Sequence, residues 1–158
     1  MPDTTLLLML DEVRSATLGV LTGVDESTSR WHPPGLANSI LWHAGHCYAV
    51  VEWLTLQSLG ETPEAPSGWF RLFGWDSRPG EIPPAEYPKL ATVVELLKTQ
   101  HVRLRSRLAG LSEQQLASPA AQRADRTVRH AILHALQDEA SHKGEIWLLR
   151  KLYQQTAR

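Results

Sequence analysis

The residues best suited to chemistry in this sequence are histidines and acids that recur at helical spacing. His134, Asp138 and His142 follow one another at steps of four residues. In an α-helix each such step turns by about 40°, so these side chains form one tilted row. His43 and His46 are three residues apart and share a face of another predicted helix. Imidazole and carboxylate groups on facing helices of a bundle are ligands for Zn²⁺, Ni²⁺, Fe²⁺ or Mn²⁺.

The spacing predicts a catalytic rather than a structural type of metal site. Two ligands four residues apart on one helix, with a third from a facing helix, leave positions open for water and substrate. The alternative is that these histidines are ordinary packed or surface residues, and the spacing alone does not decide between the two. His101 lies in the apolar seam of a further helix. It is interpreted as a core histidine, with a hydrogen bond to a ligand or substrate as the alternative.

Apolar residues at three- and four-residue steps predict the elements that position these side chains. The expected fold is all-α: one domain over residues 1–158, built as an up-and-down bundle of four helices. A chain of 158 residues is long enough to fold without a metal or disulfide. One further helical turn is expected over residues 111–116. The four long helices are predicted over about Leu6–Gly23, Ser39–Gly60, Lys89–Gly110 and Thr127–Tyr153.

Residues 61–88 form a long insertion between the second and third predicted helices. They hold six of the ten prolines of the chain, and no helical period survives there. The insertion is also rich in aromatic residues, which a solvated linker would lack. We therefore expect this insertion to be ordered and to contain one short helix. We also expect it to return over the site and to form an aromatic wall for a substrate. The aromatic residues concerned are Trp69, Phe70, Phe73 and Trp75, with Trp69, Phe73 and Trp75 as the wall.

Composition excludes several classes of protein. Sixteen basic and seventeen acidic residues nearly balance, which argues against a nucleic-acid-binding protein. The single cysteine, Cys47, excludes an internal disulfide and a cysteine-based zinc site. The longest apolar stretch, at about Ile40–Val51, contains two histidines and is too short to cross a membrane. We expect a cytoplasmic protein that binds neither nucleic acid nor membrane.

Two segments resemble the signatures of the DinB-like superfamily of metalloenzymes. The turn Trp31–Gly35 followed by Asn38–His46 is similar to the first signature, in which a proline-containing turn leads into a helix with a tryptophan and a histidine. The segment His134–Ile146 resembles the second, H-x-x-x-(D/H)-E-x-x-H-x-G-q-I. The order of the predicted elements agrees with this family over nearly the whole chain.

The resemblance implies a four-helix up-down-down-up bundle with a mononuclear site between the second and fourth helices. By position, the ligands would be His46, Asp138 and His142. Asp138 replaces a histidine found in many members, and this resembles the branch of mycothiol-dependent isomerases and thiol transferases. The resemblance therefore implies a divalent metal (Zn, Ni or Fe), a low-molecular-weight thiol and a small-molecule substrate, in thiol transfer, thiol-dependent isomerisation or hydrolysis. The alternatives are a non-catalytic metal-binding stress-response bundle that acts through its dimer surface, and a scaffold without metal.

The family resemblance also implies a homodimer. Apolar residues beyond those that a four-helix core needs point the same way. A symmetric helical dimer is therefore expected to use Trp53, Trp147 and Leu148.

The neighbours of the proposed ligands have alternative interpretations. His43 is expected either to hydrogen-bond a ligand or substrate, or to bond a backbone carbonyl. His134 either orients Asp138 or is a polar core residue. Glu139 competes with Asp138 for the carboxylate role, although the row through His134 favours Asp138. Cys47 is expected to be a buried apolar group rather than a nucleophile.

Two arginines of the insertion also have two interpretations. Arg71 and Arg78 are either surface charges, which we favour, or a clamp for a carboxylate or phosphate.

Overall fold

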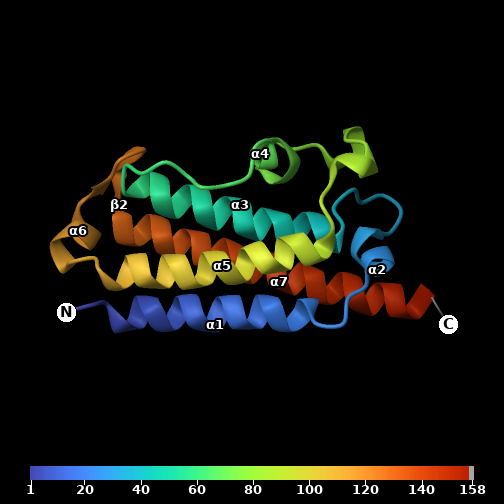
Figure 1. Cartoon of the computed structure of the whole chain (residues 1–158), viewed down its shortest axis with the longest axis horizontal. Coiled ribbons are helices and arrows are strands. Elements are labelled where there is room, and N and C mark those ends of the chain that lie inside the picture. Colours follow the sequence, from blue (N-terminus) through green and yellow to red (C-terminus); the bar gives the residue numbers. More distant parts are fainter. Residues whose placement is uncertain (157–158) are drawn as a thin grey trace.

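The computed structural model describes residues 1–156, and within them four long helices lie side by side (Figure 1). The colours of Figure 1 show that α1 and α7 run in one direction, and α3 and α5 in the other. This mostly helical structure agrees with the predicted all-α class. No helix of the described part is long and apolar enough to cross a membrane. The long helices are α1 (Thr4–Leu21), α3 (Ile40–Ser58), α5 (Leu90–Ala109) and α7 (Val128–Thr156).

Capping residues set the ends of these helices. The carboxylate of Asp3 accepts a hydrogen bond from the Leu6 amide at the start of α1, and the Ser39 hydroxyl accepts one from the Trp42 amide at the start of α3. Beyond the end of α3, Gly60 has a φ of 73°, a conformation that glycine adopts at little cost. The helix ends consequently lie within a few residues of those predicted.

Shorter elements connect the bundle helices. The predicted turn at 111–116 corresponds to α6, whereas α2 and the two-stranded ribbon were not predicted. The ribbon is antiparallel, and its second strand is mostly exposed, so no alternation of apolar residues reveals it in the sequence. These elements are α2 (Glu26–Arg30), α6 (Glu113–Ala117), β1 (Pro119–Ala120) and β2 (Arg123–Thr127).

The insertion between α3 and α5 is ordered and contains α4 (Trp69–Phe73) with two short 3₁₀ turns. It packs along α3 through aromatic pairs. The rings of Trp69 and Tyr48 are 5.2 Å apart, and those of Phe70 and Trp53 are 4.5 Å apart. Figure 1 shows α4 lying against α3 on the side away from α1. The insertion is therefore part of the packed structure, as predicted.

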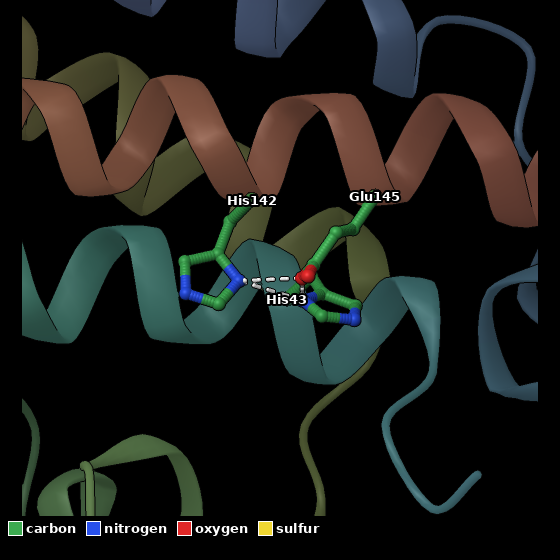
Figure 2. A group of neighbouring side chains, drawn as sticks. All are labelled: His43, His142 and Glu145. Atoms are coloured by element: carbon green, nitrogen blue, oxygen red, sulfur yellow. Dashed lines mark hydrogen bonds and ion pairs between the residues drawn. The ribbon is translucent and has the colours of Figure 1, made fainter.

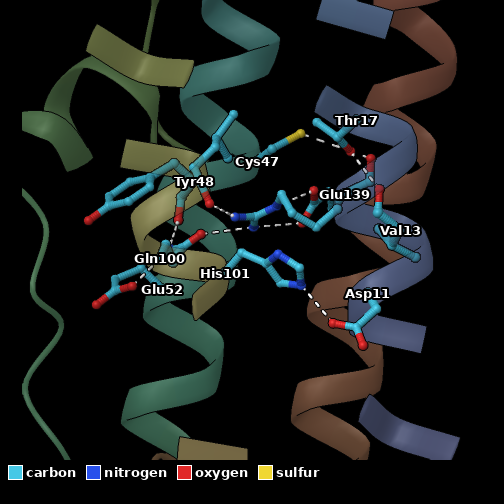
Figure 3. A network of polar contacts seen from close by, with 11 residues as sticks. Asp11, Val13, Thr17, Cys47, Tyr48, Glu52, Gln100, His101 and Glu139 are labelled. Carbon is cyan, nitrogen blue, oxygen red and sulfur yellow. Dashed lines mark hydrogen bonds and ion pairs between the residues drawn. The ribbon is translucent and has the colours of Figure 1, made fainter. Parts of the chain in front are cut away.

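A buried polar network crosses the bundle, which otherwise has two apolar clusters as its core (Figure 3). Arg14 of α1 is fully buried and donates to both carboxylate oxygens of Glu139, at 2.8 and 2.9 Å. It also donates to the Leu97 carbonyl at 2.6 Å and to Gln100 at 2.8 Å. Gln100 in turn donates to Glu52 of α3 at 2.7 Å. The network thus joins all four long helices and fixes the rotation of α7 about its axis.

Candidate metal centre

The structure brings together the three side chains that the family resemblance implied as ligands. His46 comes from α3, and Asp138 and His142 come from consecutive turns of α7. The Oδ2 atom of Asp138 lies 3.5 Å from Nε2 of His46 and 3.7 Å from Nε2 of His142. Ligand atoms about 2.1 Å from a tetrahedral cation lie about 3.4 Å apart, so this spacing suits a metal ion. One ligand atom from each residue lies within 4.8 Å of the others.

The imidazole of His46 is held with its free nitrogen towards Asp138. Its Nδ1 lies 2.6 Å from the backbone carbonyl of Phe73. A carbonyl only accepts hydrogen bonds, so Nδ1 carries the proton and Nε2 presents a lone pair. This approach depends on Gly45, because a Cβ there would lie 2.3 Å from the Phe73 ring. Glycine next to His46 therefore lets α4 come close enough to orient the ligand.

Asp138 provides the observation that tests whether a cation fits. Its Oδ2 atom is buried and has no hydrogen-bond partner among the described residues. The Nε2 of His46 that faces it is also an acceptor. Two acceptors directed at each other in a buried space are costly unless a cation lies between them. The donor set of two imidazoles and one carboxylate suits Zn²⁺ or Fe²⁺.

His142 is held from its other side by His43 and Glu145 (Figure 2). The Nδ1 of His142 lies 3.0 Å from Oε2 of Glu145 and 2.8 Å from Nδ1 of His43. Donation from Nδ1 leaves Nε2 free to face Asp138, as a metal ligand requires. The group His43, His142 and Glu145 is itself compact enough for a cation, but it uses the opposite nitrogen of His142. We therefore interpret His43 and Glu145 as the residues that orient His142.

The protonation states also suit a cation. Burial, with repulsion from His142 and His46, lowers the pKa of His43 to about 3. Burial and repulsion from His46 likewise lower the pKa of His142. Burial raises the pKa of Asp138, but the contacts with His46 and His142 outweigh this, and the pKa lies below its usual value. At neutral pH the site therefore offers a neutral imidazole from His142 and an ionised carboxylate from Asp138.

Two of the predicted neighbours lie away from the centre. His101 bonds Asp11 of α1 at 2.7 Å and is not near the ligands, which agrees with the interpretation as a packed histidine. His134 is exposed, with its ring 6.4 Å from that of His130. The 40° drift at each four-residue step explains this, because it takes the row out of the α3–α7 interface.

Glu139 and Cys47 belong to the bundle core. Glu139 is buried and paired with Arg14 at 2.8 Å, so the carboxylate at the centre is that of Asp138. The thiol of Cys47 is fully buried, 3.9 Å from the Glu139 carbonyl. Burial and then the Glu139 carboxylate raise the pKa of this thiol, which disfavours a nucleophile.

The aromatic wall expected from the insertion differs from the observed one. Trp69 and Phe73 are buried, and Phe73 acts through its backbone carbonyl. Trp75 is half exposed with its ring 6.4 Å from that of His46, and it lines a different cavity together with Phe70. The cavity that contains His43 and His142 is instead walled by residues 35–38 and the C-terminal half of α7. The direction of the chain predicted that the insertion passes close to His46. It did not predict which side chains of the insertion face the centre.

The two arginines of the insertion are engaged by acids. Arg71 pairs with Glu86, and Arg78 lies 3.3 Å from Glu81. All four side chains are largely exposed, as expected for surface charges.

Three features of the centre were not predicted from the sequence. Trp42 stacks on the His46 ring at 4.7 Å and 22°, and its four-residue spacing from His46 was the available signal. Glu145 continues the row of α7 three residues after His142, yet it was given no role. The contact of the Phe73 carbonyl with His46 could not be predicted from the sequence, because every residue carries a backbone carbonyl.

These observations define a class: a helical bundle with a His/carboxylate/His centre between two of its long helices. Residues 9–146 match the DinB superfamily, and the chain belongs to that family. The fold is similar to the crystal structure of a conserved protein from Enterococcus faecalis, with a TM-score of 0.71 and 18% identity. That match covers 96% of this chain and 97% of the other. No curated protein matches the sequence.

Proposed function

We propose that this protein is a metal-dependent enzyme whose divalent cation is held by His46, Asp138 and His142. The observation that carries the proposal is the buried Oδ2 of Asp138, which lacks a hydrogen-bond partner in the described chain and faces two imidazole nitrogens. The Phe73 carbonyl accepts a hydrogen bond from Nδ1 of His46, so the lone pair of Nε2 is free to bind a cation. Three protein ligands leave a position for a substrate.

The reaction proposed first is thiol transfer or thiol-dependent isomerisation, with hydrolysis as the second candidate. The carboxylate at 138 supports the first, through the resemblance to the mycothiol-dependent branch. A divalent cation at such a site lowers the pKa of a bound thiol or water and polarises an electrophile. Glu145 and His43 hold the imidazole of His142, and Trp42 covers that of His46. A cavity of about 360 Å³ adjoins His142 on the side of His43 and Glu145.

We also propose a homodimer formed through the exposed face of α7. Trp53, expected to take part, instead lies on α3 with its ring 4.5 Å from that of Phe70. Leu133, Trp147 and Leu148 are 38, 54 and 53% exposed and lie within about 100° of one another around the helix. Sedimentation is expected to show a dimer at micromolar concentration, and Trp147→Asp is expected to dissociate it. A wild-type monomer would contradict this. A dimer that binds metal without an exchangeable water or thiol would favour the non-catalytic alternative.

The metal proposal is tested by elemental analysis of protein purified without a histidine tag. Wild type is expected to bind one divalent cation per chain, and His46→Ala well below one. His130→Ala is the matched control, because His130 is exposed on α7 and outside the ligand set. Full occupancy in His46→Ala would overturn the ligand assignment. The enzyme proposal requires that metal-loaded wild type, and not His46→Ala, turns over a thiol with an electrophile or hydrolyses a model amide or ester.

A further inference from the structure

A second cavity lies between α3 and the end of α4, and none of the proposed metal ligands lines it. Its volume is about 180 Å³, below the roughly 300–1,000 Å³ of pockets for drug-sized ligands, so it has room for one compact chemical group. The residues that line it are Trp53, Phe70, Gly74, Trp75 and Asp76. The cavity is therefore aromatic in character, with one carboxylate.

Two of the three aromatic rings stand nearly at right angles to each other. The rings of Trp53 and Phe70 are 4.5 Å apart and inclined by 74°. Both side chains are partly buried and Trp75 is half exposed, so all three rings keep accessible surface. The face of an aromatic ring is electron-rich and attracts a cation that lies within about 6 Å of the ring centre. The walls of this cavity consequently favour a cationic ligand.

The turn that carries Trp75 is held in place by the protein itself. Gly74 ends α4, and a Cβ there would collide with the carbonyl oxygen of Phe70, so only glycine allows so tight a turn. The Gly74 amide donates to that carbonyl at 2.9 Å. The indole of Trp42 in α3 also donates to the Ser77 hydroxyl at 3.0 Å. A cavity held in this way loses little freedom when a ligand binds.

The charge at the cavity also favours a cation. Among the described residues that line it, Asp76 is the one with a charged side chain. The neighbouring arginines pair with other acids, Arg71 with Glu86 and Arg78 with Glu81. The carboxylate of Asp76 can therefore serve a cation from solution.

The chemistry of the lining residues selects the kind of cation. A primary ammonium or a guanidinium group carries several N–H donors, and each needs an acceptor in place of the water that it loses. Aromatic rings do not supply such acceptors, and Asp76 is a single carboxylate. A quaternary ammonium group has no N–H donor, so it loses no hydrogen bond when its methyl groups contact the rings.

We infer that this cavity is an aromatic cage for the quaternary ammonium group of a small molecule. The methyl groups contact the three rings, and Asp76 balances the charge. The inference goes beyond the proposed function and does not rest on the metal centre, because the lining residues of the cage are not among its ligands.

Choline and its uncharged analogue 3,3-dimethylbutan-1-ol test the charge preference. The two molecules have nearly the same shape, but a carbon atom replaces the charged nitrogen in the second. Binding of each to the purified protein is measured by isothermal titration calorimetry. Choline is expected to bind saturably and at least about tenfold more tightly than the alcohol, because only the cation gains from the ring faces and the carboxylate.

Substitutions of two exposed residues make the test specific to the cage. Trp75→Leu keeps an apolar side chain but removes the ring, and it is expected to weaken choline binding about 3- to 30-fold. Trp75→Phe keeps a ring and is expected to stay within about twofold of wild type. Asp76→Asn removes the charge and is expected to weaken binding by about fivefold. Asp125→Asn is the matched control, because Asp125 is exposed on β2 and outside the cavity, and it is expected to bind choline as wild type does.

Four outcomes would overturn the inference. They are the absence of choline binding by wild type, equal affinity for choline and the alcohol, wild-type affinity in Trp75→Leu, and binding to phosphatidylcholine vesicles without binding of free choline. The last would assign the cavity to a lipid surface instead of a small molecule. Trp75→Phe and Asp76→Asn keep the test valid if Trp75→Leu fails to fold, which circular dichroism checks.

Discussion

Replacing Glu145 by Gln is expected to weaken metal binding about tenfold. The carboxylate of Glu145 lies 3.0 Å from Nδ1 of His142 and stabilises the proton that leaves Nε2 free for the cation. Loss of such a partner costs about 10- to 100-fold in metal affinity. The side chain of Glu145 is 54% exposed, so solvent screens it and the low end applies. Tenfold corresponds to about 1.4 kcal/mol of binding free energy.

Two measurements check this magnitude. Trp42, one of six tryptophans, stacks on His46, so a change in the total tryptophan fluorescence is expected on metal binding in a titration against a competing chelator. At a fixed saturating metal concentration, a loss of about 1.4 kcal/mol also lowers the melting temperature by about 3–6 °C. Glu95→Gln is the control, because Glu95 is exposed on α5 and pairs with Lys98. Its affinity for metal is expected to equal that of wild type.

The size of the effect also decides between two roles for Glu145. If the group His43, His142 and Glu145 held the cation itself, Glu145→Gln would remove a ligand and the loss would exceed 100-fold. If Glu145 only orients His142, binding persists with the tenfold loss. Affinity within twofold of wild type would refute the orienting role, and with it the hydrogen-bond interpretation of Figure 2.

Three further predictions concern stability. Chelation is expected to lower the melting temperature but to keep the far-ultraviolet helix signal, because two apolar clusters hold the bundle without the cation; loss of that signal would make the metal structural. The pKa of His43 is about 3 in the fold and about 6.5 when unfolded, so between these values the unfolded chain binds more protons. Urea midpoints of the metal-free protein should thus fall as pH drops from about 6.5 towards 3, and His43→Gln should flatten that slope; an equal slope would contradict the burial argument. Arg14→Met leaves the Glu139 carboxylate buried and unpaired and should cost about 3–5 kcal/mol of unfolding free energy, most of it recovered when Glu139→Met is added; an additive double variant would show that the pair is not coupled.

The sequence predicted the elements with strong periodicity and missed those without it. The long helices carry apolar seams that ordinary helical spacing reveals, and cap residues such as Ser39 mark their starts. The short helix α2 and the ribbon formed by β1 and β2 are held by local hydrogen bonds and a few long-range contacts. Single-sequence periodicity has no access to those contacts.

The part of the site that lies on one helix was predictable from the spacing of its residues. The row on α7 placed Asp138 and His142 together, and the family motif supplied His46 from α3. The walls of the pocket were not predictable, because they depend on how the segment at 35–38 folds over α7 rather than on any period. The aromatic residues of α4 are of a type that could line a pocket. Their rings instead pack in part against Tyr48 and Trp53 of α3.

The choice between Asp138 and Glu139 shows how the core controls the chemistry. Consecutive residues of a helix point about 100° apart, so only one of the two can face α3 at the centre. Arg14 of α1 is fully buried and donates two hydrogen bonds to the Glu139 carboxylate and a third to the Leu97 carbonyl of α5. With Glu139 fixed, Asp138 must face His46, and His142 follows one turn later. The buried ion pair therefore sets the rotation of α7 that turns Asp138 and His142 towards His46.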